Sequence, residues 1–522
     1  MTGRLFCLLC FLAVTPARTT VSTVSFYSVS LLLQQDTLRK IIEIRGIQGN
    51  DRQLSRITRC FNPETQSITL ERAVFGFPDG ESGPVPEWSV DTLSGSGGWP
   101  LSLVTAFPAL REGMTMEYRV EITDWSENWR EGAWGVFSPS VKGLRPDTCK
   151  FSVTGDLIEN LHWNGTGYRV SRDSGKVEFI ATDSAGVLVI SPFSTYTELE
   201  NFILGKISPA LESGYPPDLR EAALQSTSAG ADEYAQSVRA KSLLCNSINR
   251  TAAVPGININ TVHSIQEILD RRRGTALEIS LVFAAMCREL GMQADILPAS
   301  DTDYGIPVPT GWNRYLVRLE SKDGNEWIME PSANLTSASY IYRPDTLYVI
   351  ENGNIQVMPP NDSMESRNIE EWYINSEEGT FTMKMNCTGW YDMMLRRKLA
   401  GLSMERTLLS LSEWSWLSGR TIVPDSCSLS DPFDLGTNMS LSVFGTLWIP
   451  TDNSITAEYL PAFNWSKPED LQCISIKKWF LAGIRNACSP NFPLIDIIDD
   501  TVVITDTSGT PGPIPVFIGV TE

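Results

Sequence analysis

The sequence predicts an α+β protein of several domains, in which β-rich regions precede and follow a central region that mixes helices with strands. Its 522 residues are too many for a single hydrophobic core. Apolar and polar residues alternate from Thr115 to Ile122, which is the period of a half-buried strand. Leu277 to Leu290 is apolar nearly all round, as in a helix buried on both sides. We therefore expect an N-terminal β-sandwich, a central α+β core and a C-terminal β-sandwich.

Composition excludes several classes of function. Apolar residues make up 42% of the chain and charged residues 20%, which is ordinary for folded protein. The net charge of −20 argues against nucleic acid and anionic membrane surfaces as partners. No Walker loop, zinc-spaced cluster or dinucleotide-binding spacing occurs, and the glycine-rich run Ser94 to Gly98 is expected to be a loop. We expect no cofactor and no metal.

The first 17 residues have the pattern of an export signal. Arg4 supplies a positive charge, Leu5 to Val14 is an apolar run, and Thr15-Pro16-Ala17 offers small residues for cleavage. The run is too short to cross a bilayer, and no later segment approaches about 18 uninterrupted apolar residues. An N-terminal strand is the alternative. The pattern predicts a periplasmic or extracellular protein without a transmembrane segment.

Residues 18–206 are expected to form the first β-domain. Met116, Tyr118, Val120 and Ile122 form one face of a strand. Ile68, Leu70 and Val74 keep the same phase in another strand, and Pro78-Asp79-Gly80 is a turn signal.

Residues 207–345 are expected to form the α+β core. A helix begins near Asp232, and Ser264 with Glu267 has the spacing of a capping box. Strands at Trp312 to Leu319 and Glu326 to Glu330 are joined through a hairpin signal, Lys-Asp-Gly-Asn.

Residues 346–522 return to β-patterning. The stretch "MSLSVFGTLWIP" alternates as a strand does. A short helix is expected at about Ile476 to Arg485, and the role of residues 453–522 is unassigned.

The stretch from Val262 to Ala333 contains an Arg-Arg-Gly lead-in, an apolar helix that ends at Leu290-Gly291, and two strands, the second followed by Pro331. In this order it resembles the core of the transglutaminase-like, papain-related superfamily. "LERAVFGFPDGESG" and "LVTAFPALREGMTMEYRVEI" resemble the uncharacterised β-domain that precedes such cores in exported bacterial proteins. "TFTMKMNCTGWYDMMLRRKLAG" resembles the β-domain that follows them.

The resemblance assigns the catalytic Cys, His and Asp of this superfamily to Ala276, Arg314 and Glu330. A methyl group cannot replace a thiolate, and a guanidinium cannot accept and return a proton near neutral pH. The triad positions are therefore degenerate, and we expect no transglutaminase or peptidase activity. Arg314 and Glu330 are expected to form a salt bridge that fills the site, with a ligand-binding role as the alternative.

The alternative hypothesis is that this protein is an enzyme that uses a cysteine at another position as its nucleophile. Outside the leader they are Cys60, Cys149, Cys245, Cys287, Cys387, Cys427, Cys473 and Cys488. Their numbers permit disulfides within each expected domain, and buried free thiols are the alternative for Cys245 and Cys287. A relocated nucleophile at Cys245 or Cys287 would make the protein a thiol-dependent acyl transferase or peptidase.

Four further residues are weaker candidates. His263 is expected to have a capping or surface role, and His162 a surface or strand position. Asp301 and Asp303 are expected in a solvated loop, since the rest of a calcium ligand set is missing. The sequence thus predicts an exported, non-catalytic transglutaminase-like protein that binds a protein or glycan, or acts as a scaffold in the cell envelope. A purely structural module is a third possibility.

Overall fold

The computed structural model describes residues 22–48, 56–84, 89–92, 101–106, 113–155, 157–212, 214–227, 231–250, 262–362, 365–375, 378–414, 422–447, 454–456, 474–482, 486–488, 495–498, 501–506 and 517–519. The chain divides into two compact units, Met1–Leu161 with Gly165–Leu188, and His162–Asn164 with Val189–Glu522. The expected export signal and the loop Ser94 to Gly98 lie outside the described residues.

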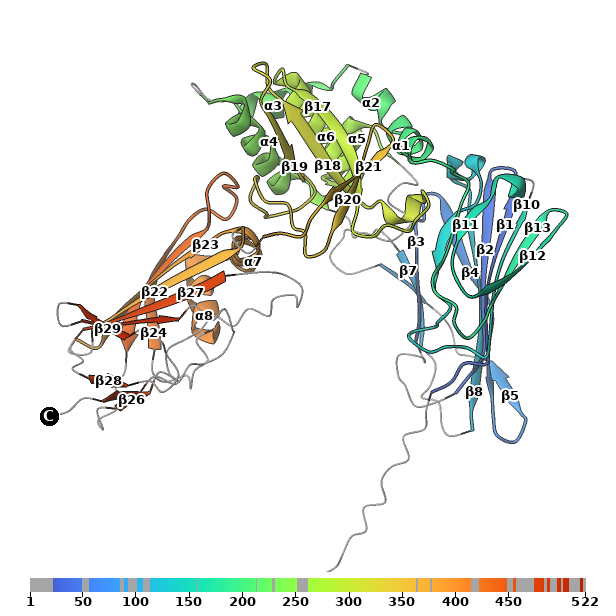
Figure 1. Ribbon diagram of the computed structural model, residues 1–522, viewed down its shortest axis with the longest axis horizontal. Coiled ribbons are helices and arrows are strands. Elements are labelled where there is room, and N and C mark those ends of the chain that lie inside the picture. The colour runs from blue at the N-terminus through green and yellow to red at the C-terminus, as the bar shows by residue number, and fades with distance from the viewer. Residues whose placement is uncertain are drawn as a thin grey trace, which may run out of the picture. The chain divides into compact units, whose positions relative to one another are not determined.

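The first unit is built mainly of strands (Figure 1). Eight strands form one sheet in the order β12-β13-β10-β1-β2-β8-β4-β5, and three form another in the order β3-β7-β6. Their bounds, with those of β9, are β1 Phe26–Gln34, β2 Thr37–Ile47, β3 Arg56–Phe61, β4 Gln66–Gly76, β5 Ser82–Pro84, β6 Ser89–Thr92, β7 Leu101–Ala106, β8 Thr115–Asp124, β9 Gly135–Phe137, β10 Thr148–Gly155, β12 Tyr168–Asp173 and β13 Lys176–Ala181.

Strand β8 has the predicted alternation, with Met116, Tyr118 and Val120 buried. In β4, Ile68, Leu70 and Val74 were expected on one buried face, and this expectation is wrong beyond Leu70. The register between β4 and β8 shifts between Leu70 and Arg72, so that Phe75 is buried and Val74 is not. A β-bulge inserts one residue and moves the following side chains to the other face.

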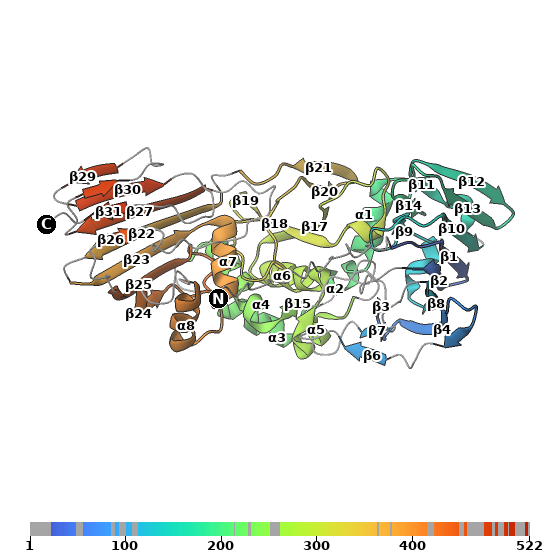
Figure 2. The same cartoon turned by 90° about the horizontal axis from the view of Figure 1, so that it is seen from below.

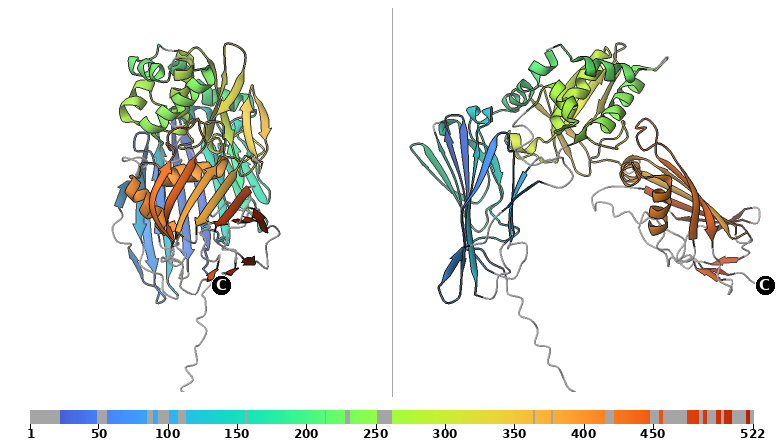
Figure 3. Two further views of the ribbon diagram at one scale, coloured as in Figure 1. Left: turned by 90° about the vertical axis from the view of Figure 1, so that its left-hand side faces the viewer. Right: turned by 180° about the vertical axis from the view of Figure 1, so that it is seen from behind.

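The second unit begins with a core of helices packed on one side of a sheet (Figure 3). The sheet has the order β19-β18-β17-β20-β21. The bounds of the elements in this part are β11 His162–Asn164, β14 Leu188–Ser191, α1 Tyr196–Gly205, α2 Ser208–Glu212, α3 Pro217–Gln225, α4 Glu233–Ser247, β15 Asn249–Arg250, α5 Ile265–Arg271, β16 Arg273–Gly274, α6 Ala276–Glu289, β17 Gln293–Ser300, β18 Arg314–Glu320, β19 Glu326–Met329, β20 Leu347–Glu351 and β21 Asn354–Met358.

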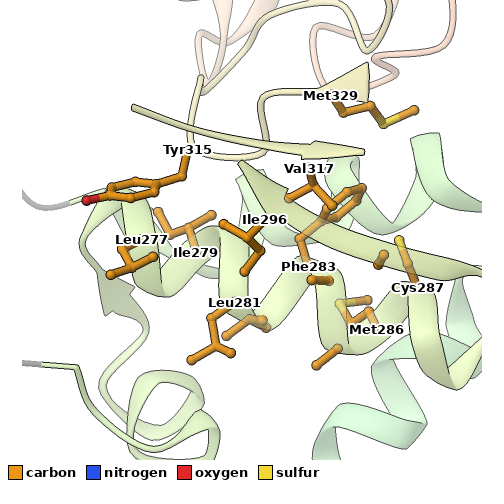
Figure 4. Close-up of a cluster of buried hydrophobic side chains, with 14 of the residues drawn as sticks. Leu277, Ile279, Leu281, Phe283, Met286, Cys287, Ile296, Tyr315, Val317 and Met329 are labelled. Carbon is orange, nitrogen blue, oxygen red and sulfur yellow. The ribbon is translucent and has the colours of Figure 1, made fainter. Parts of the chain in front are cut away.

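Helix α6 is the centre of this core, as its apolar sequence predicts. Every residue from Ala276 to Cys287 is buried. Leu281 and Phe283 pack within the same cluster as Val317 of β18 and Met329 of β19 (Figure 4). Ser280 of α6 donates a hydrogen bond to the carbonyl of Tyr315 of β18 at 3.0 Å, and Leu277 and Tyr315 lie at the same end of the cluster (Figure 4).

The predicted local signals of the core are confirmed. Asp232 caps α4, and Ser264 with Glu267 forms a reciprocal capping box at α5. The hairpin between β18 and β19 turns at Gly324, whose positive φ of 79° suits glycine.

The last part of the second unit is a seven-stranded sheet, with α7 in contact with β22 and β23 (Figure 2). Its order is β24-β25-β23-β22-β27-β30-β29, and β26-β31-β28 form a small separate sheet. The bounds are β22 Arg367–Asn375, β23 Thr380–Cys387, α7 Gly389–Leu399, α8 Met404–Trp414, β24 Ile422–Leu429, β25 Ser440–Leu447, β26 Ser454–Thr456, β27 Ile474–Ala482, β28 Asn486–Cys488, β29 Ile495–Ile498, β30 Thr501–Asp506 and β31 Phe517–Gly519.

The helix expected at Ile476 to Arg485 is wrong. Residues Ile474–Ala482 form strand β27, which pairs in parallel with β22 and antiparallel with β30. Strand β22 comes from a distant part of the chain, so tertiary pairing overrides the local pattern.

The coarse expectation, a strand-rich protein of several parts with several sheets, is confirmed. The boundaries at residues 206 and 345 stay predictions. Among the described residues, no helix is both long enough and apolar enough to cross a bilayer.

Candidate functional site

Ala276 is the first residue of α6 and is only 1% exposed. Two backbone N–H groups close to it, those of Thr275 and Glu278, take part in a capping box. Thr275 accepts a hydrogen bond from the N–H of Glu278 at 3.2 Å, and the Glu278 carboxylate accepts one from the N–H of Thr275 at 2.7 Å. The capping box therefore accounts for the backbone N–H groups of Thr275 and Glu278 at this helix end.

His263 is joined to the same capping box, which sequence reasoning did not foresee. Its Nδ1 lies 2.6 Å from Oε1 of Glu278, and its backbone N–H donates to the same oxygen at 2.9 Å. Nη1 of Arg271 lies 2.7 Å from Nε2 of the imidazole. Because a guanidinium can only donate, Nε2 accepts and the proton resides on Nδ1, facing Glu278. His263 thus links α5 to the start of α6.

The pKa of Glu278 is set by opposing causes. Burial raises it, whereas His263 and the backbone N–H of Thr275 lower it, and the net result is a pKa below the ordinary 4.5. The carboxylate is therefore ionised at neutral pH and serves as a charged acceptor.

Arg314 and Glu330 form the close ion pair predicted from the sequence. Nε of Arg314 donates to Oε1 of Glu330 at 3.0 Å, and Nη2 donates to Oε2 at 2.6 Å. The exposed fractions are 8% for Arg314 and 3% for Glu330. This is the two-pronged geometry that a guanidinium and a carboxylate favour.

Arg314 has two further partners. Nη1 donates to Asp301 at 2.7 Å, and Nη2 also donates to the carbonyl of Tyr342 at 2.9 Å. Burial lowers the pKa of Arg314, but Glu330 and Asp301 outweigh burial and raise it. The guanidinium is permanently charged and engaged, so it cannot act as a base. Asp301, expected in a solvated loop, is instead part of this ion-pair network.

Two more arginines lie around Glu330, and sequence reasoning missed both. Arg250, on β15 beside the lead-in strand of α6, donates to the carbonyl of Ser332 at 3.2 Å. Arg397 of α7 is exposed and interacts electrostatically with Glu330 and Tyr342. Burial lowers the pKa of both arginines, and Glu330 acts in the opposite direction. No spacing signal joins positions 250, 330 and 397, which only the fold brings together.

Lys241 and Cys245 lie one turn apart on α4. Lys241 is 0% exposed, and its Nζ has no hydrogen-bond partner among the described residues. Burial lowers the pKa of Lys241, although electrostatic interactions with Cys245 and Glu330 act to raise it. Cys245 is partly exposed, and burial raises its pKa although Lys241 and the backbone N–H of Leu335 act against this. The Cys245 thiol is therefore protonated near pH 7, and burial makes the charged form of the Lys241 amine less favourable than in water.

Four other cysteines, Cys149, Cys287, Cys387 and Cys427, are also free thiols. Cys287 is 0% exposed on α6, and burial raises its pKa far above the ordinary 9.0. Cys149, Cys387 and Cys427 are unpaired as well. A disulfide that uses Cys149 is therefore absent, and a nucleophile at Cys287 would lack both access and a stabilised thiolate.

The remaining candidates have ordinary surroundings. His162 lies exposed on β11, as expected of a surface strand residue. Asp303 accepts hydrogen bonds from the hydroxyl of Tyr196 at 3.1 Å and from the N–H of Gly305 at 2.8 Å. In the part of the chain that the structure describes, no three His, Cys, Asp or Glu side chains gather as a metal site requires.

Neither a protein family nor a curated protein matches this chain. A solved structure from Parabacteroides distasonis ATCC 8503, described provisionally as a protease, superimposes with a TM-score of 0.57 at 11% identity, over 96% of this chain and 93% of that chain. At this identity the likeness shows a shared fold over nearly the whole length and nothing about activity. An M1 zinc metallopeptidase from Deinococcus radiodurans has a TM-score of 0.20 at 15% identity, over 32% of this chain and 42% of that chain, too weak to support an inference.

Proposed function

We propose that this chain is an exported, non-catalytic protein built on a transglutaminase-like core, with a β-sandwich before and after it, and that it acts by binding or as a scaffold in the cell envelope. One observation carries the non-catalytic part. The side chain at the position of the general base is Arg314, and its guanidinium is already bound to Glu330, Asp301 and the Tyr342 carbonyl.

The start of α6 supports the same proposal. In this superfamily the helix N-terminus would hold and activate a thiolate. Here the Ala276 side chain has no reactive group, and the N–H groups of Thr275 and Glu278 take part in a capping box. Among the described residues, position 276 therefore carries no nucleophile and position 314 no base.

A relocated thiol is the alternative, and Cys245 is its better candidate. Cys245 is partly exposed, whereas Cys287 is completely buried. However, burial raises the pKa of both thiols, which lowers the fraction of reactive thiolate at neutral pH.

Assays with the full protein separate the two functions. We expect no amine incorporation into casein and no casein cleavage, and slow alkylation of Cys245 and Cys287 by iodoacetamide under native conditions. Cys245→Ser and Cys287→Ser identify the labelled thiol, and Cys427→Ser is the matched control on a free thiol outside the core. Turnover that either of the first two substitutions abolishes would overturn the proposal in favour of the thiol enzyme.

A further inference from the structure

The seven-stranded sheet of the C-terminal part has one buried face and one face that we call the open face. In β22 and β23 every second residue is buried, among them Trp372, Phe381 and Met383. The residues between them project to the open face, because side chains alternate along a strand. Phe444 of β25 and Tyr373 of β22 project there, with exposed fractions of 48% and 38%. Strands β25, β23, β22 and β27, which carry this face, lie side by side (Figure 2).

The exposed rings belong to one row that crosses these strands. Thr382 of β23 pairs with Phe444 on one side and with Tyr373 on the other. Tyr373 in turn pairs with Phe480 of β27, and their rings are stacked, with 4.7 Å between centroids and 7° between planes. Directly paired residues project from the same face of a sheet. Because neighbouring strands are about 4.8 Å apart, the row spans roughly 14 Å from Phe444 to Phe480.

Lys384 adds a cation to this row. Its Nζ lies over the ring of Tyr373, 5.2 Å from the centroid. Since β23 and β27 flank β22, the ring is held between Lys384 and Phe480. Lys384 is also the diagonal neighbour of Phe444, a relation that brings a long side chain within reach. The exposed ammonium makes no hydrogen bond or ion pair with any residue that the structure describes, so its donors are available to a ligand.

The open face is locally positive, in a chain whose net charge is −20. Glu371 of β22 pairs in register with Lys384 and with Lys478 of β27, so two cations flank one carboxylate. That carboxylate accepts a hydrogen bond from the hydroxyl of Tyr373 at 3.0 Å, which fixes the ring. The outward positions of β23 and β25 hold no carboxylate. The charge of this face therefore complements an anionic partner.

Hydroxyl and amide side chains surround the rings. Apart from Lys384 and Phe444, the outward positions of β23 and β25 are Thr380, Thr382, Asn386, Ser440, Ser442 and Thr446. Such groups donate and accept hydrogen bonds, as the hydroxyls of a sugar do. The rings are separated by these polar groups and form no continuous apolar patch of the kind that centres a protein–protein interface. The face therefore fits a partner that combines apolar ring faces, hydroxyl groups and negative charge.

We propose that the open face of the C-terminal sheet binds a carboxylated glycan, a linear chain of sugars that carries uronic-acid carboxylates. The apolar face of a sugar ring packs on Phe444, and its hydroxyls exchange hydrogen bonds with Thr382 and Ser442. A carboxylate of the chain pairs with the ammonium of Lys384. A straight row across the strands matches a linear ligand. The inference names the partner of the proposed binding role and rests on that role.

Isothermal titration calorimetry of the full chain at low ionic strength tests the site. The probes are tetrasaccharides of polygalacturonate, alginate and hyaluronate. Maltotetraose controls for hydroxyl groups without charge, and a short poly-L-glutamate controls for charge without sugar. Phe444→Ala and Lys384→Gln are the main variants, because both side chains are exposed and can be truncated without opening the core. Val357→Ala, 62% exposed on strand β21, and Arg406→Gln, exposed on α8, are the matched controls.

We expect at least one of the three carboxylated tetrasaccharides to bind, with maltotetraose and poly-L-glutamate weaker by about tenfold or more. Phe444→Ala and Lys384→Gln should each weaken binding by about fivefold or more, with both control variants unchanged. Added salt should weaken binding to wild type more than binding to Lys384→Gln, because salt screens the ion pair.

The site is overturned if none of the three tetrasaccharides binds, or if Phe444→Ala binds them as tightly as wild type. Equal affinity for poly-L-glutamate would also overturn it and would indicate an acidic peptide as the partner. Cysteine-dependent turnover, by contrast, would overturn the proposed non-catalytic function whatever binds at Phe444.

Discussion

The guanidinium of Arg314 meets the carboxylate of Glu330 through two parallel hydrogen bonds, of 3.0 and 2.6 Å, in a site almost closed to solvent. Removing one partner of such a pair leaves the other charge buried. Arg314→Met or Glu330→Gln should each lower the free energy of unfolding by about 3–5 kcal/mol. Denaturant unfolding of both single variants and the double variant gives their coupling, which we expect to exceed about 1 kcal/mol.

The neighbouring pair Arg318–Asp295 is the control for this cycle. It lies on the same sheet, with side-chain exposed fractions of 30% and 54%. Its coupling should stay below about 1 kcal/mol, because solvent screens exposed pairs. Equal coupling in the two cycles would show that the Arg314–Glu330 pair is not a buried replacement for the triad.

Ala276→Cys should not restore turnover. The new thiol would lie at the start of α6, but Arg314 cannot accept its proton. Casein cleavage and amine incorporation by this variant, in a Cys287→Ser background, are the measurements. Turnover would mean that another residue acts as base, and His263, which shares Glu278 with this helix end, would be the first to replace.

Glu278→Gln should destabilise the protein at neutral pH by about 1–3 kcal/mol, because His263 and Thr275 lose a charged acceptor. The folded state lowers the pKa of Glu278, so its contribution is present above the unfolded value of 4.5 and is lost as pH falls through the folded pKa. The variant should therefore show a flatter loss of stability below pH 4.5. Glu267→Gln, in the exposed capping box of α5, should change stability much less. If the free energy of unfolding falls equally steeply below pH 4.5 for wild type and Glu278→Gln, Glu278 is not the charged acceptor that stabilises this helix end.

Lys241→Met should stabilise the protein by about 1–3 kcal/mol, since it removes a buried amine without a hydrogen-bond partner among the described residues. The folded state lowers the pKa of Lys241 from 10.5, so the unfolded chain binds the extra proton. Wild-type stability should therefore fall as pH decreases from 10.5 to the folded pKa, and the variant should lose this slope. Lys384→Met, at an exposed position of β23, serves as the comparison. A variant less stable than wild type would show that Nζ has a partner.

Local chemistry was enough to predict the capping box of Ser264 and Glu267, the hairpin at Gly324 and the buried helix α6, because each depends on residues close in sequence. The Arg314–Glu330 pair was predicted from the resemblance of this region to the transglutaminase-like core, which implies that the two positions are neighbours. Strand β27 was missed because its parallel partner β22 lies far from it in the sequence. The link between His263 and Glu278, and the approach of Arg250 and Arg397 to Glu330, depend in the same way on tertiary packing that no spacing encodes.

The ion-pair network around Arg314 also limits which sequences can be reached by single substitutions. Arg314→His alone would remove the cation that Glu330 and Asp301 share, and would leave the Glu330 carboxylate buried without its partner. The expected loss is a large fraction of the free energy of unfolding of a typical domain. Ala276→Cys alone would add a thiol without a base. Each step toward a thiol–imidazole pair is therefore unproductive or destabilising until the others are in place. The contacts of Arg314 with Glu330 and Asp301 therefore oppose the introduction of an imidazole at this position by one substitution.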